Sequence, residues 1–587
     1  MAALGVLIAI PFAALPFWQA SQAPNAFTLA GVAVREGTNQ PLNHVLVTIN
    51  STQRREWRLS YITDADGRFI FPNLPAGKWD LSAEKNGYPL ESYQASNEGF
   101  STAIAVGPRF DTTHIVFPLH PAGILTGTVV DDQGDPVRQA SVVLFRTGVR
   151  EGKVSTWNAG QQQTDAAGEF SFASLQPGTY TIAVSARPWY AQNFYAPGFG
   201  GIGGQSFPYG FVHEGQPIPD AQPSSEPVQH GDRDLAYAIT YYGDTTDAAS
   251  AQPITVEEGN EAQAHITLRA VPAWRLTVRE PGATEEPESP PPEAPTGRAP
   301  MRRAMSQLQR MRRLGINLSV AGPGGFPIRF PTQVTSDPGG NQQALGIPSG
   351  HYTLDFSGPG ASFRQTIDIS GDQVIDVAGK PPVSLSGRVT WEGAGQTGLD
   401  KPDIDNTFVY LSSEGQRMMN AGTTVSKDGS FDFQNNPPQP GRYRISLRRP
   451  GGFVVRSVQA KGAQYAKGWL ELTGESPVQL SIIATSNLAK IDGIAIRDNA
   501  PCSAAIVLLL PADGNPDSIR RDQSDSDGTF TLPAVLPGRY TLVAIDKGRD
   551  LAYQDPAVMA KYLAQGEAIS VPLKEGRVSI TVQARVP

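Results

Sequence analysis

The sequence predicts an all-β protein, a tandem array of about five small β-sandwich modules. Composition is the first observation behind this prediction, because the 587 residues include 60 Gly and 50 Pro and only 18% are charged. Many turn formers with few charges favour short strands over long surface helices. The second observation is the stretch TDADGRFIFPNLPAGKWDLSAEKNGY, which begins at Thr63 and returns in similar form three more times. The third is length, which exceeds what a single core supports.

Charge and cysteine content narrow the function classes. The formal net charge of −8 argues against a dedicated nucleic-acid binder, which usually carries a basic domain. Cys502 is the one cysteine, so no intrachain disulfide can form. It follows Pro501 and has no neighbouring His in the sequence, so we expect a buried or inert thiol rather than a nucleophile.

The first residues read as an export signal. An apolar stretch from Ala2 to Trp18 is followed by Ser21-Gln22-Ala23, which is small at the two positions that a signal peptidase reads. We therefore predict a signal peptide over residues 1–23, although no Lys or Arg precedes the apolar stretch. The alternative is an apolar first strand. No later stretch reaches the length of a membrane span, so we expect no integral span in the mature chain.

Each copy of the repeat has the same parts in the same order. It opens with a strand that contains a glycine, continues through a turn into a second apolar strand, and then reaches an Asp-containing turn that ends in Gly. An alternating strand of the type F-x-F follows, and a Pro-Gly pair leads into a return strand that starts with an aromatic residue. The opening glycines are Gly31, Gly127, Gly387 and Gly493.

The repeated residues have structural explanations. Gly67, Gly168, Gly429 and Gly528 end the Asp turns, where a positive φ is expected. Alternation places the phenylalanines of each F-x-F strand on one buried face while Arg68, Glu169 and Asp432 face outward. We expect the return strands to begin at Gly77, Gly178, Gly441 and Gly538, and their first aromatic residues, Trp79, Tyr180, Tyr443 and Tyr540, to cover the end of each sandwich.

Spacing reveals a fifth, weaker copy. Gly77 and Gly178 are 101 residues apart and Gly441 and Gly538 are 97 apart, but 263 residues separate Gly178 from Gly441. The stretch ALGIPSGHYTLDF fills this gap, and AWRLTV is its expected opening strand. The predicted modules are 24–120, 121–272 with an insertion at 187–235, a degenerate module at 273–380 with a disordered loop at 280–313, 381–484, and 485–587.

The repeat resembles a known family. The opening strand with its glycine, the D-x-x-G turn, the F-x-F strand and the P-G-x-Y strand are similar to the carboxypeptidase regulatory-like domain, a transthyretin-like or prealbumin-like sandwich akin to Cna-B-type repeats of bacterial surface proteins. The resemblance covers four modules well and the third poorly. It implies a domain without catalysis of its own, which in carboxypeptidases accompanies a separate zinc domain that we do not find in this sequence.

The insertion at 187–235 is the candidate ligand-contact region. It is rich in Gly and aromatic residues, and aromatic side chains suit the apolar faces of sugars or a partner chain. The alternative is a loop that folds back on its own sandwich. The candidate contact residues are Trp189, Tyr190, Phe194, Tyr195, Phe207 and Tyr209.

The loop at 280–313 has an acidic, Pro-rich half and a basic half. Met301, Met305 and Leu308 lie at helical spacing, which allows a short amphipathic helix that could lie on an acidic membrane surface. The alternative, which we prefer, is an extended and solvated loop.

The search for catalytic or metal motifs favours none. The seven histidines are scattered along the sequence without a close zinc-ligand spacing, so we interpret them as surface or strand-edge residues. The motif GFGGIG at 198–203 follows Pro197 rather than a strand, so we do not interpret it as a dinucleotide site. The turns DADG and DSDG, at Asp64 and Asp525, lack the Glu of a helix-loop-helix calcium loop, and turn-forming aspartates are expected.

These observations lead to one functional prediction with two alternatives. Short joints such as THIVFPLHPAGILTGTVV predict limited bending and an extended rod. We expect a secreted, extracellular or periplasmic, cell-envelope protein without catalytic activity or cofactor, which acts in adhesion, scaffolding or spacing at the bacterial surface. Its partner would be a polysaccharide or another envelope protein. The alternatives are a carbohydrate-binding protein that uses the aromatic insertion, and an accessory subunit of a secreted hydrolase.

Overall fold

The computed structural model describes most of the chain, and every structural statement below concerns these residues. They are 26–54, 56–95, 99–191, 234–279, 315–336, 341–357, 362–376, 383–393, 404–413, 421–448, 452–546, 551–572 and 578–585. Ten small sheets dominate this part of the chain, which confirms the predicted all-β fold of tandem sandwiches. The expected signal peptide (1–23) and the loop 280–313 lie outside the described residues.

The first sandwich joins a three-stranded sheet to a five-stranded sheet. Its strands are β1 (Phe27–Arg35), β2 (Leu46–Ser51), β3 (Arg58–Ile62), β4 (Arg68–Leu74), β5 (Gly77–Lys85), β6 (Tyr88–Ser92), β7 (Ile104–Val106) and β8 (Ile115–Leu119). The smaller sheet has the order β4-β1-β8, and the larger has β3-β2-β5-β6 with β7 also paired to β5. Trp79 and Phe69 lie in the core between the sheets.

The second sandwich repeats this plan with a longer hairpin. Its strands are β9 (Gly123–Asp131), β10 (Ser141–Arg150), β11 (Lys153–Gln163), β12 (Glu169–Leu175), β13 (Gly178–Ser185), β15 (Thr240–Tyr241), β16 (Ile254–Val256) and β17 (Glu261–Leu268), with a 3-10 turn η2 (Ala248–Ser250). The sheet orders are β12-β9-β17 and β11-β10-β13-β15, with β16 also paired to β13.

The third sandwich contains the degenerate copy of the repeat. Its elements are β14 (Leu235–Tyr237), β18 (Ala270–Arg279), β19 (Gly315–Ala321), η3 (Pro323–Gly325), β20 (Pro327–Phe330), β21 (Gln333–Ser336), β22 (Gln342–Pro348), β23 (Gly350–Ser357), β24 (Ser362–Ile369) and β25 (Gln373–Asp376). The sheet orders are β14-β18-β22-β21, with β25 paired to β18, and β20-β19-β23-β24. The stretch AWRLTV lies in β18 and opens this sandwich, as the sequence predicts.

The fourth sandwich consists of a four-stranded and a five-stranded sheet. Its elements are β26 (Leu385–Glu392), η5 (Ile404–Asn406), β27 (Phe408–Ser413), β28 (Ala421–Thr424), β29 (Ser430–Asp432), β30 (Gly441–Arg448), β31 (Val454–Lys461), β32 (Gln464–Ala466), β33 (Trp469–Leu472) and β34 (Val478–Thr485). The sheet orders are β29-β26-β34-β31 and β28-β27-β30-β33-β32.

The last sandwich carries the longest helix of the described residues, the eight-residue α2. Its elements are β35 (Ala489–Arg497), β36 (Ala500–Pro501), β37 (Ile506–Pro511), η6 (Pro516–Ser518), β38 (Arg520–Gln523), β39 (Thr529–Val535), β40 (Gly538–Ile545), α2 (Pro556–Leu563), β41 (Glu567–Val571) and β42 (Val578–Arg585). The sheet orders are β36-β35-β39, with β42 paired to β35, and β38-β37-β40-β41.

All five sandwiches place the opening strand between the same two neighbours. It pairs antiparallel with the strand that precedes the return strand and parallel with a strand late in the sandwich. In the first sandwich β1 lies between β4 and β8, and in the second β9 lies between β12 and β17. The other three use β18 between β22 and β25, β26 between β29 and β34, and β35 between β39 and β42.

The glycine of the opening strand makes room for a phenylalanine ring and for a neighbouring backbone. A Cβ on Gly127 would lie 2.5 Å from Cζ of Phe170 and 2.1 Å from the carbonyl oxygen of Ala264. Both distances are far below a normal contact, so no other residue fits there without movement of the ring or of β17. The same arrangement recurs at Gly31 with Phe69 and at Gly387 with Phe431. At Gly493 the ring is that of Phe530, and the other close neighbour is the side chain of Val582.

The turns and return strands also follow the predictions. Gly67, Gly168, Gly429 and Gly528 all have a positive φ, between 72° and 84°. The phenylalanines of the F-x-F strands are buried, and Arg68, Glu169 and Asp432 are exposed. Return strands begin at the four predicted glycines, and Trp79, Tyr180, Tyr443 and Tyr540 are at most 5% exposed. The tyrosines donate their hydroxyl groups to a carbonyl four residues earlier, as Tyr180 does to Gln176 at 2.6 Å.

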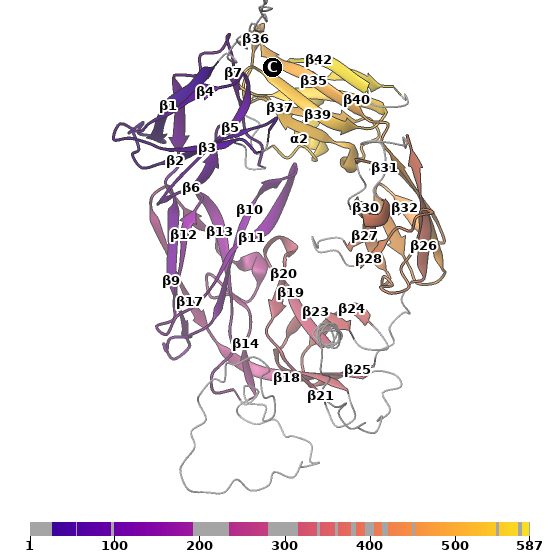
Figure 1. The fold of residues 1–587 in the computed structure, drawn as a ribbon. Coiled ribbons are helices and arrows are strands. Elements are labelled where there is room, and N and C mark those ends of the chain that lie inside the picture. Colours follow the sequence, from indigo (N-terminus) through magenta and orange to yellow (C-terminus); the bar gives the residue numbers. More distant parts are fainter. Residues whose placement is uncertain are drawn as a thin grey trace, which may run out of the picture.

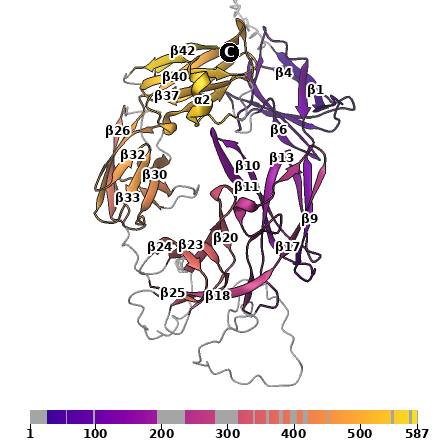
Figure 2. The same cartoon turned by 180° about the vertical axis from the view of Figure 1, so that it is seen from behind.

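The five sandwiches follow one another around a ring, with the first and last side by side (Figures 1 and 2). The predicted extended rod is therefore wrong. Main-chain and side-chain hydrogen bonds join the first and last sandwiches, including Ser526 N to Ala103 O at 3.0 Å and Ala105 N to Ser526 Oγ at 2.8 Å. The hairpin of β10 and β11 also reaches the last sandwich, where Gln554 N donates to Gly152 O at 2.8 Å.

The joints between neighbouring sandwiches are of different chemical kinds. At the first joint, Glu91 accepts hydrogen bonds from the main chain and ring Nδ1 of His120, at 2.9 and 2.8 Å, and the ring bond raises the pKa of His120. At the second joint, Phe145 and Ala183 belong to the same apolar cluster as the core of the third sandwich. At the joint of the fourth and fifth, Arg444 pairs with Asp517 at 2.7 Å.

Substitution of Gly127 by Ala should destabilise the second sandwich by about 3 kcal/mol, because the added methyl group overpacks against Phe170 and β17. Gly134→Ala is the matched control. Gly134 has a φ of 87° but open space around its Cβ position, so only the backbone cost of about 1 kcal/mol is expected. Hydrogen exchange of β9 and β12 in the full chain measures both, and equal effects of the two variants would contradict the packing explanation.

Candidate functional site

The described part of the aromatic insertion lies directly after β13. Trp189 is 71% exposed, and its ring contacts that of Tyr190 edge to face, with centroids 5.7 Å apart. The structure therefore brings these two candidate residues together and leaves Trp189 open to solvent. The other four candidates, Phe194, Tyr195, Phe207 and Tyr209, lie outside the described residues.

The residues that flank this aromatic pair hold it against two sandwiches. Arg187 donates from Nε to the carbonyl oxygen of Pro331 in the third sandwich at 2.9 Å, and burial lowers the pKa of its guanidinium. Tyr190 hydrogen-bonds the hydroxyl of Tyr237, whose pKa is raised chiefly by burial. Ala191 is 5% exposed. The chain around Trp189 is therefore fixed on both sides while the indole itself is free.

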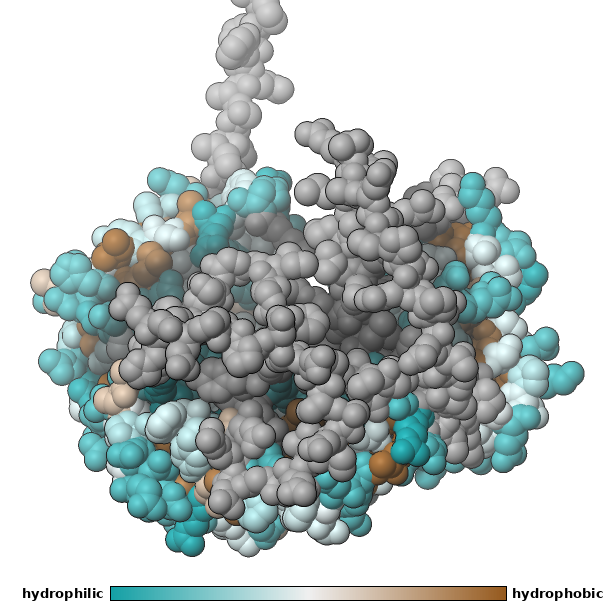
Figure 3. All heavy atoms as spheres, turned by 90° about the horizontal axis from the view of Figure 1, so that it is seen from below, coloured by the Kyte–Doolittle hydropathy of each residue, from teal (hydrophilic) through white to brown (hydrophobic). Residues whose placement is uncertain are grey.

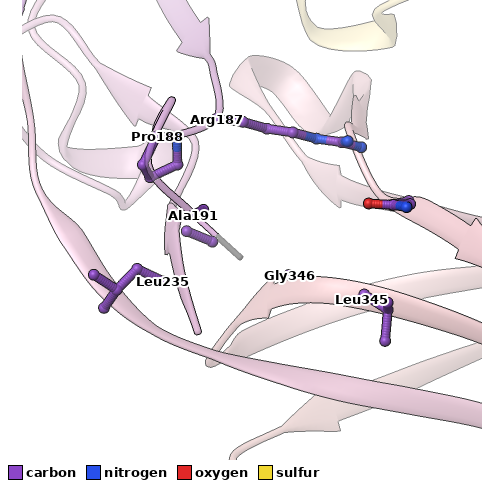
Figure 4. Close-up of a pocket in the computed structure, with 8 residues that line it drawn as sticks. Arg187, Pro188, Ala191, Leu235, Leu345 and Gly346 are labelled. Carbon is purple, nitrogen blue, oxygen red and sulfur yellow. The ribbon is translucent and has the colours of Figure 1, made fainter. Parts of the chain in front are cut away.

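A small cavity lies under this segment (Figure 4). Its volume is about 20 Å³, which suits one water molecule and is more than tenfold below the size of a typical ligand pocket. Oε1 of Gln333 is buried there without a hydrogen-bond partner among the described residues, so a water in this cavity would have an acceptor. The cavity is lined by Arg187, Pro188, Ala191, Leu235, Ala236, Gln333, Leu345 and Gly346.

The geometry therefore offers a surface platform rather than a pocket. An exposed indole with a tyrosine at its edge presents a flat apolar area with a polar hydroxyl nearby, which is the usual aromatic contact to a sugar ring or a partner side chain. Among the coloured residues of the face seen in Figure 3, brown hydrophobic residues are scattered between hydrophilic ones.

Of the seven histidines, His213 and His230 lie outside the described residues. His114 and His351 are exposed and pair with Asp111 and Asp368, and His120 lies at the first joint as described above. Among the described residues no group of three or more His, Cys, Asp or Glu side chains is placed to hold a metal ion. Cys502 is 4% exposed, as expected, and burial raises the pKa of its thiol. The GFGGIG motif lies outside the described residues.

The two D-x-D-G turns differ in a way that the sequence does not reveal. In the first sandwich Asp64 caps its own turn, accepting hydrogen bonds from the main chain of Asp66 and Arg68 at 3.0 and 2.8 Å. In the last sandwich Asp527 caps the turn through Thr529, while Asp525 turns away and bonds the first sandwich. The main chain of Asp525 still forms the turn, with Gly528 N donating to its carbonyl at 2.8 Å, but its side chain bonds Lys78 and the main chain of Ala103 instead of capping the turn.

Comparison with known proteins agrees with the repeat. Fold and repeat define a tandem β-sandwich protein. Residues 28–107 and 124–194 match the family model of the carboxypeptidase regulatory-like domain, in agreement with the resemblance seen in the sequence of the first two modules. No curated protein matches the chain.

Several solved structures of bacterial proteins match the chain at low identity. They include the minor pilin GBS52 of Streptococcus agalactiae, at 16% identity over 42% of this chain and 97% of that one, with a TM-score of 0.21. The shaft pilin SpaA of Lactobacillus rhamnosus GG is 9% identical over 42% and 97%, with a TM-score of 0.19. The Bacillus anthracis TIE protein is 10% identical over 95% and 74%, with a TM-score of 0.17. At these identities and scores the likeness says nothing about function.

Proposed function

We propose that the chain is a non-catalytic scaffold of a bacterial cell envelope, exported from the cytoplasm, that holds a partner at the surface. The observation that supports this proposal most directly is the structural role of the residues that recur in each copy of the repeat. The repeated glycines, phenylalanines, tyrosines and most of the turn aspartates serve packing and turn formation within their own sandwiches. Because the residues of the motif already have packing or turn-forming roles, the repeated unit itself favours a structural function.

The arrangement of the sandwiches in a ring favours one kind of scaffold over another. An extended rod would hold two points far apart, whereas a closed ring fixes five sandwiches relative to one another. We therefore favour a platform that presents loops over a spacer. For the platform we propose the module boundaries given by the repeat, at 24–120, 121–272, 273–380, 381–484 and 485–587, with β14 of the second segment pairing with β18 of the third sandwich. None of the helices in the described part of the chain has the length and hydrophobicity to span a bilayer.

Expression of the full chain with a carboxyl-terminal tag in a bacterial host tests this proposal. We expect a mature protein that begins at Pro24 and lies outside the cytoplasm, with crosslinks to envelope components in intact cells. Mass spectrometry of the amino terminus and cell fractionation measure the outcome. An uncleaved chain in the cytoplasm, or turnover of a glycan or peptide by the purified protein, would overturn it.

A carbohydrate-binding role is the second candidate, and the exposure of Trp189 is the observation that favours it. If the aromatic insertion binds a polysaccharide, Trp189→Ala should reduce binding on a glycan array at least tenfold, since stacking on an indole carries much of such an interaction. Tyr195→Ala is expected to act similarly. Because Trp189 is 71% exposed, its variant should melt within about 1 °C of the wild type. A wild-type chain that binds no glycan on the array would sink this alternative.

A further inference from the structure

The contact between the first and last sandwiches covers the open edge of β7. The main-chain nitrogen of Ala103 donates to Oδ1 of Asp525 at 3.1 Å, and that of Ala105 donates to Oγ of Ser526 at 2.8 Å. The carbonyl of Ala103 accepts from the main chain of Ser526 at 3.0 Å. An uncovered strand edge invites pairing with other chains, so this turn of the last sandwich protects β7 in the ring.

Comparison of equivalent residues within the chain shows that this contact is a specialised use of the repeat. Asp165 of the second sandwich, like Asp64 of the first, caps its own turn through two main-chain nitrogens, both at 2.9 Å. Asp525 occupies the same position of the repeat, yet its carboxylate bonds only to the first sandwich. The task of capping the turn passes to Asp527. The last sandwich has thus released one carboxylate for the contact between sandwiches.

The remaining contacts at this joint are polar as well. Lys78 of β5 pairs with Asp525 and bonds Thr529, and its Nζ lies 3.8 Å from Oδ1 of Asp527. Nε2 of Gln523 donates to the carbonyl of Gln94 at 2.7 Å and to Oγ1 of Thr102 at 2.9 Å. The guanidinium of Arg521 lies over the ring of Phe100.

The second joint is built differently. There Phe145 and Ala183, on the outer side of the second sandwich, share one apolar cluster with residues such as Phe330 and Tyr352 of the third. Separation of these two sandwiches would expose apolar core, which is costly. Separation of the first sandwich from the last would replace hydrogen bonds between the sandwiches with hydrogen bonds to water. Each such bond contributes only about 1 kcal/mol net to stability. The joint that closes the ring is therefore easier to separate than the second joint, and no chain connection holds it.

We propose that the joint between the first and last sandwiches is a reversible latch, at which the ring opens into a string of folded sandwiches. Each sandwich has an apolar cluster of its own, so opening leaves the cores intact. Opening also requires the tip of the β10–β11 hairpin to leave the last sandwich, where it is held by hydrogen bonds from Gln554 to Glu151 and Gly152, both at 2.8 Å. The proposal goes beyond the scaffold function and does not depend on it.

The charges at the latch make its closure sensitive to pH. Four carboxylates gather here against one lysine, Lys78. Burial raises the pKa of Asp522 to about 6, and burial also raises the pKa of Asp525 and of Asp80. The charged groups at the latch are Lys78, Asp80, Asp522, Asp525 and Asp527, with Arg521 beside Phe100 and Lys490 and Asp492 on the adjoining β35.

The direction of the pH effect follows from these shifts. A carboxyl whose pKa is higher in the closed ring than in the open chain binds its proton more tightly in the closed ring. For Asp525, whose carboxylate bonds across the joint and would return to solvent on opening, protonation therefore stabilises closure. This stabilisation is fully present below the ordinary pKa of 3.8 for Asp and is lost as pH rises through the raised pKa of Asp525. The ring should be tightest in mildly acidic solution and should open more often near neutral pH.

Asp525→Ala should open the latch without unfolding either sandwich, because the carboxylate caps no turn of its own. We expect hydrogen exchange of the segment Ala103–Val106 to rise at least tenfold and the radius of gyration in X-ray scattering to increase. Asp165→Ala is the matched control, since it removes the equivalent carboxylate where it serves only its own turn. That control should leave both measurements at their wild-type values.

Lys78→Met is a second variant, which removes the charge that Asp525 contacts on the first sandwich and keeps the apolar stem of the side chain. Exchange in β37 and β40 reports whether the last sandwich remains folded in each variant. If Asp525→Ala and Lys78→Met both leave Ala103–Val106 as protected as in Asp165→Ala, the latch is overturned. A wild-type chain whose scattering fits an extended string at every pH from 5 to 7.5 would overturn it equally.

The pH dependence is tested on the wild-type chain by the same exchange measurement at pH 5, 6 and 7.5, corrected for the intrinsic rate of exchange. We expect opening to increase from pH 5 to 7.5. Asp525→Asn removes the titrating group at the joint and should flatten the profile, whereas Asp165→Asn should not. A profile that is flat in the wild type, or that rises toward low pH, would contradict the assigned direction.

Discussion

A phenylalanine ring lies against the one position of the opening strand that has no side chain, and each well-formed sandwich depends on this contact. The glycine satisfies two demands together. Its missing Cβ leaves room for the ring of Phe69 or Phe170, and also for the carbonyl of the parallel neighbour, Ile115 or Ala264, which a Cβ would approach to 2.1 Å. The opening strand can therefore pair on both sides while an aromatic ring fills the core beneath it.

The third sandwich shows that glycine and phenylalanine depend on each other. In its register Val278 faces Gln342, at the positions where Gly31 faces Phe69 in the first sandwich. Where the ring is absent, a β-branched residue can occupy the opening strand, and Val278 is fully buried there. The pair has changed as a unit, which explains why this copy is the hardest to detect in the sequence although its strand order is the same.

The sequence predicts what is local and periodic, and this covers most of each sandwich. The F-x-F strands, the glycines with positive φ and the buried return-strand aromatics all follow from spacing and alternation. The closed ring does not follow from spacing and alternation, because its contacts join residues that are far apart in sequence. Lys78 meets Asp525 across 447 residues, and Asp525 stands in the same sequence context as Asp64. At the candidate site, the composition of the insertion predicts the aromatic pair Trp189 and Tyr190. It does not predict that Arg187 holds the start of this segment against the third sandwich, because that contact joins residues distant in sequence.

The strand order explains why a rod was expected and why the chain bends instead. Because the opening strand and a late strand of each sandwich run parallel, the chain tends to enter at one end and leave at the other, and a string of such units would be straight if the joints added nothing. The bend comes from side chains on outer faces. Phe145 is 1% exposed although it lies outside the core of its own sandwich, because Phe326 and its neighbours in the third sandwich cover it. Apolar burial at the second joint sets the curvature, and the polar contacts of Asp525 then need only close a gap that the curved chain has already brought together. Because the second joint brings the ends of the chain together, the joint between the first and last sandwiches can form in the folded protein even though its own contacts are weak.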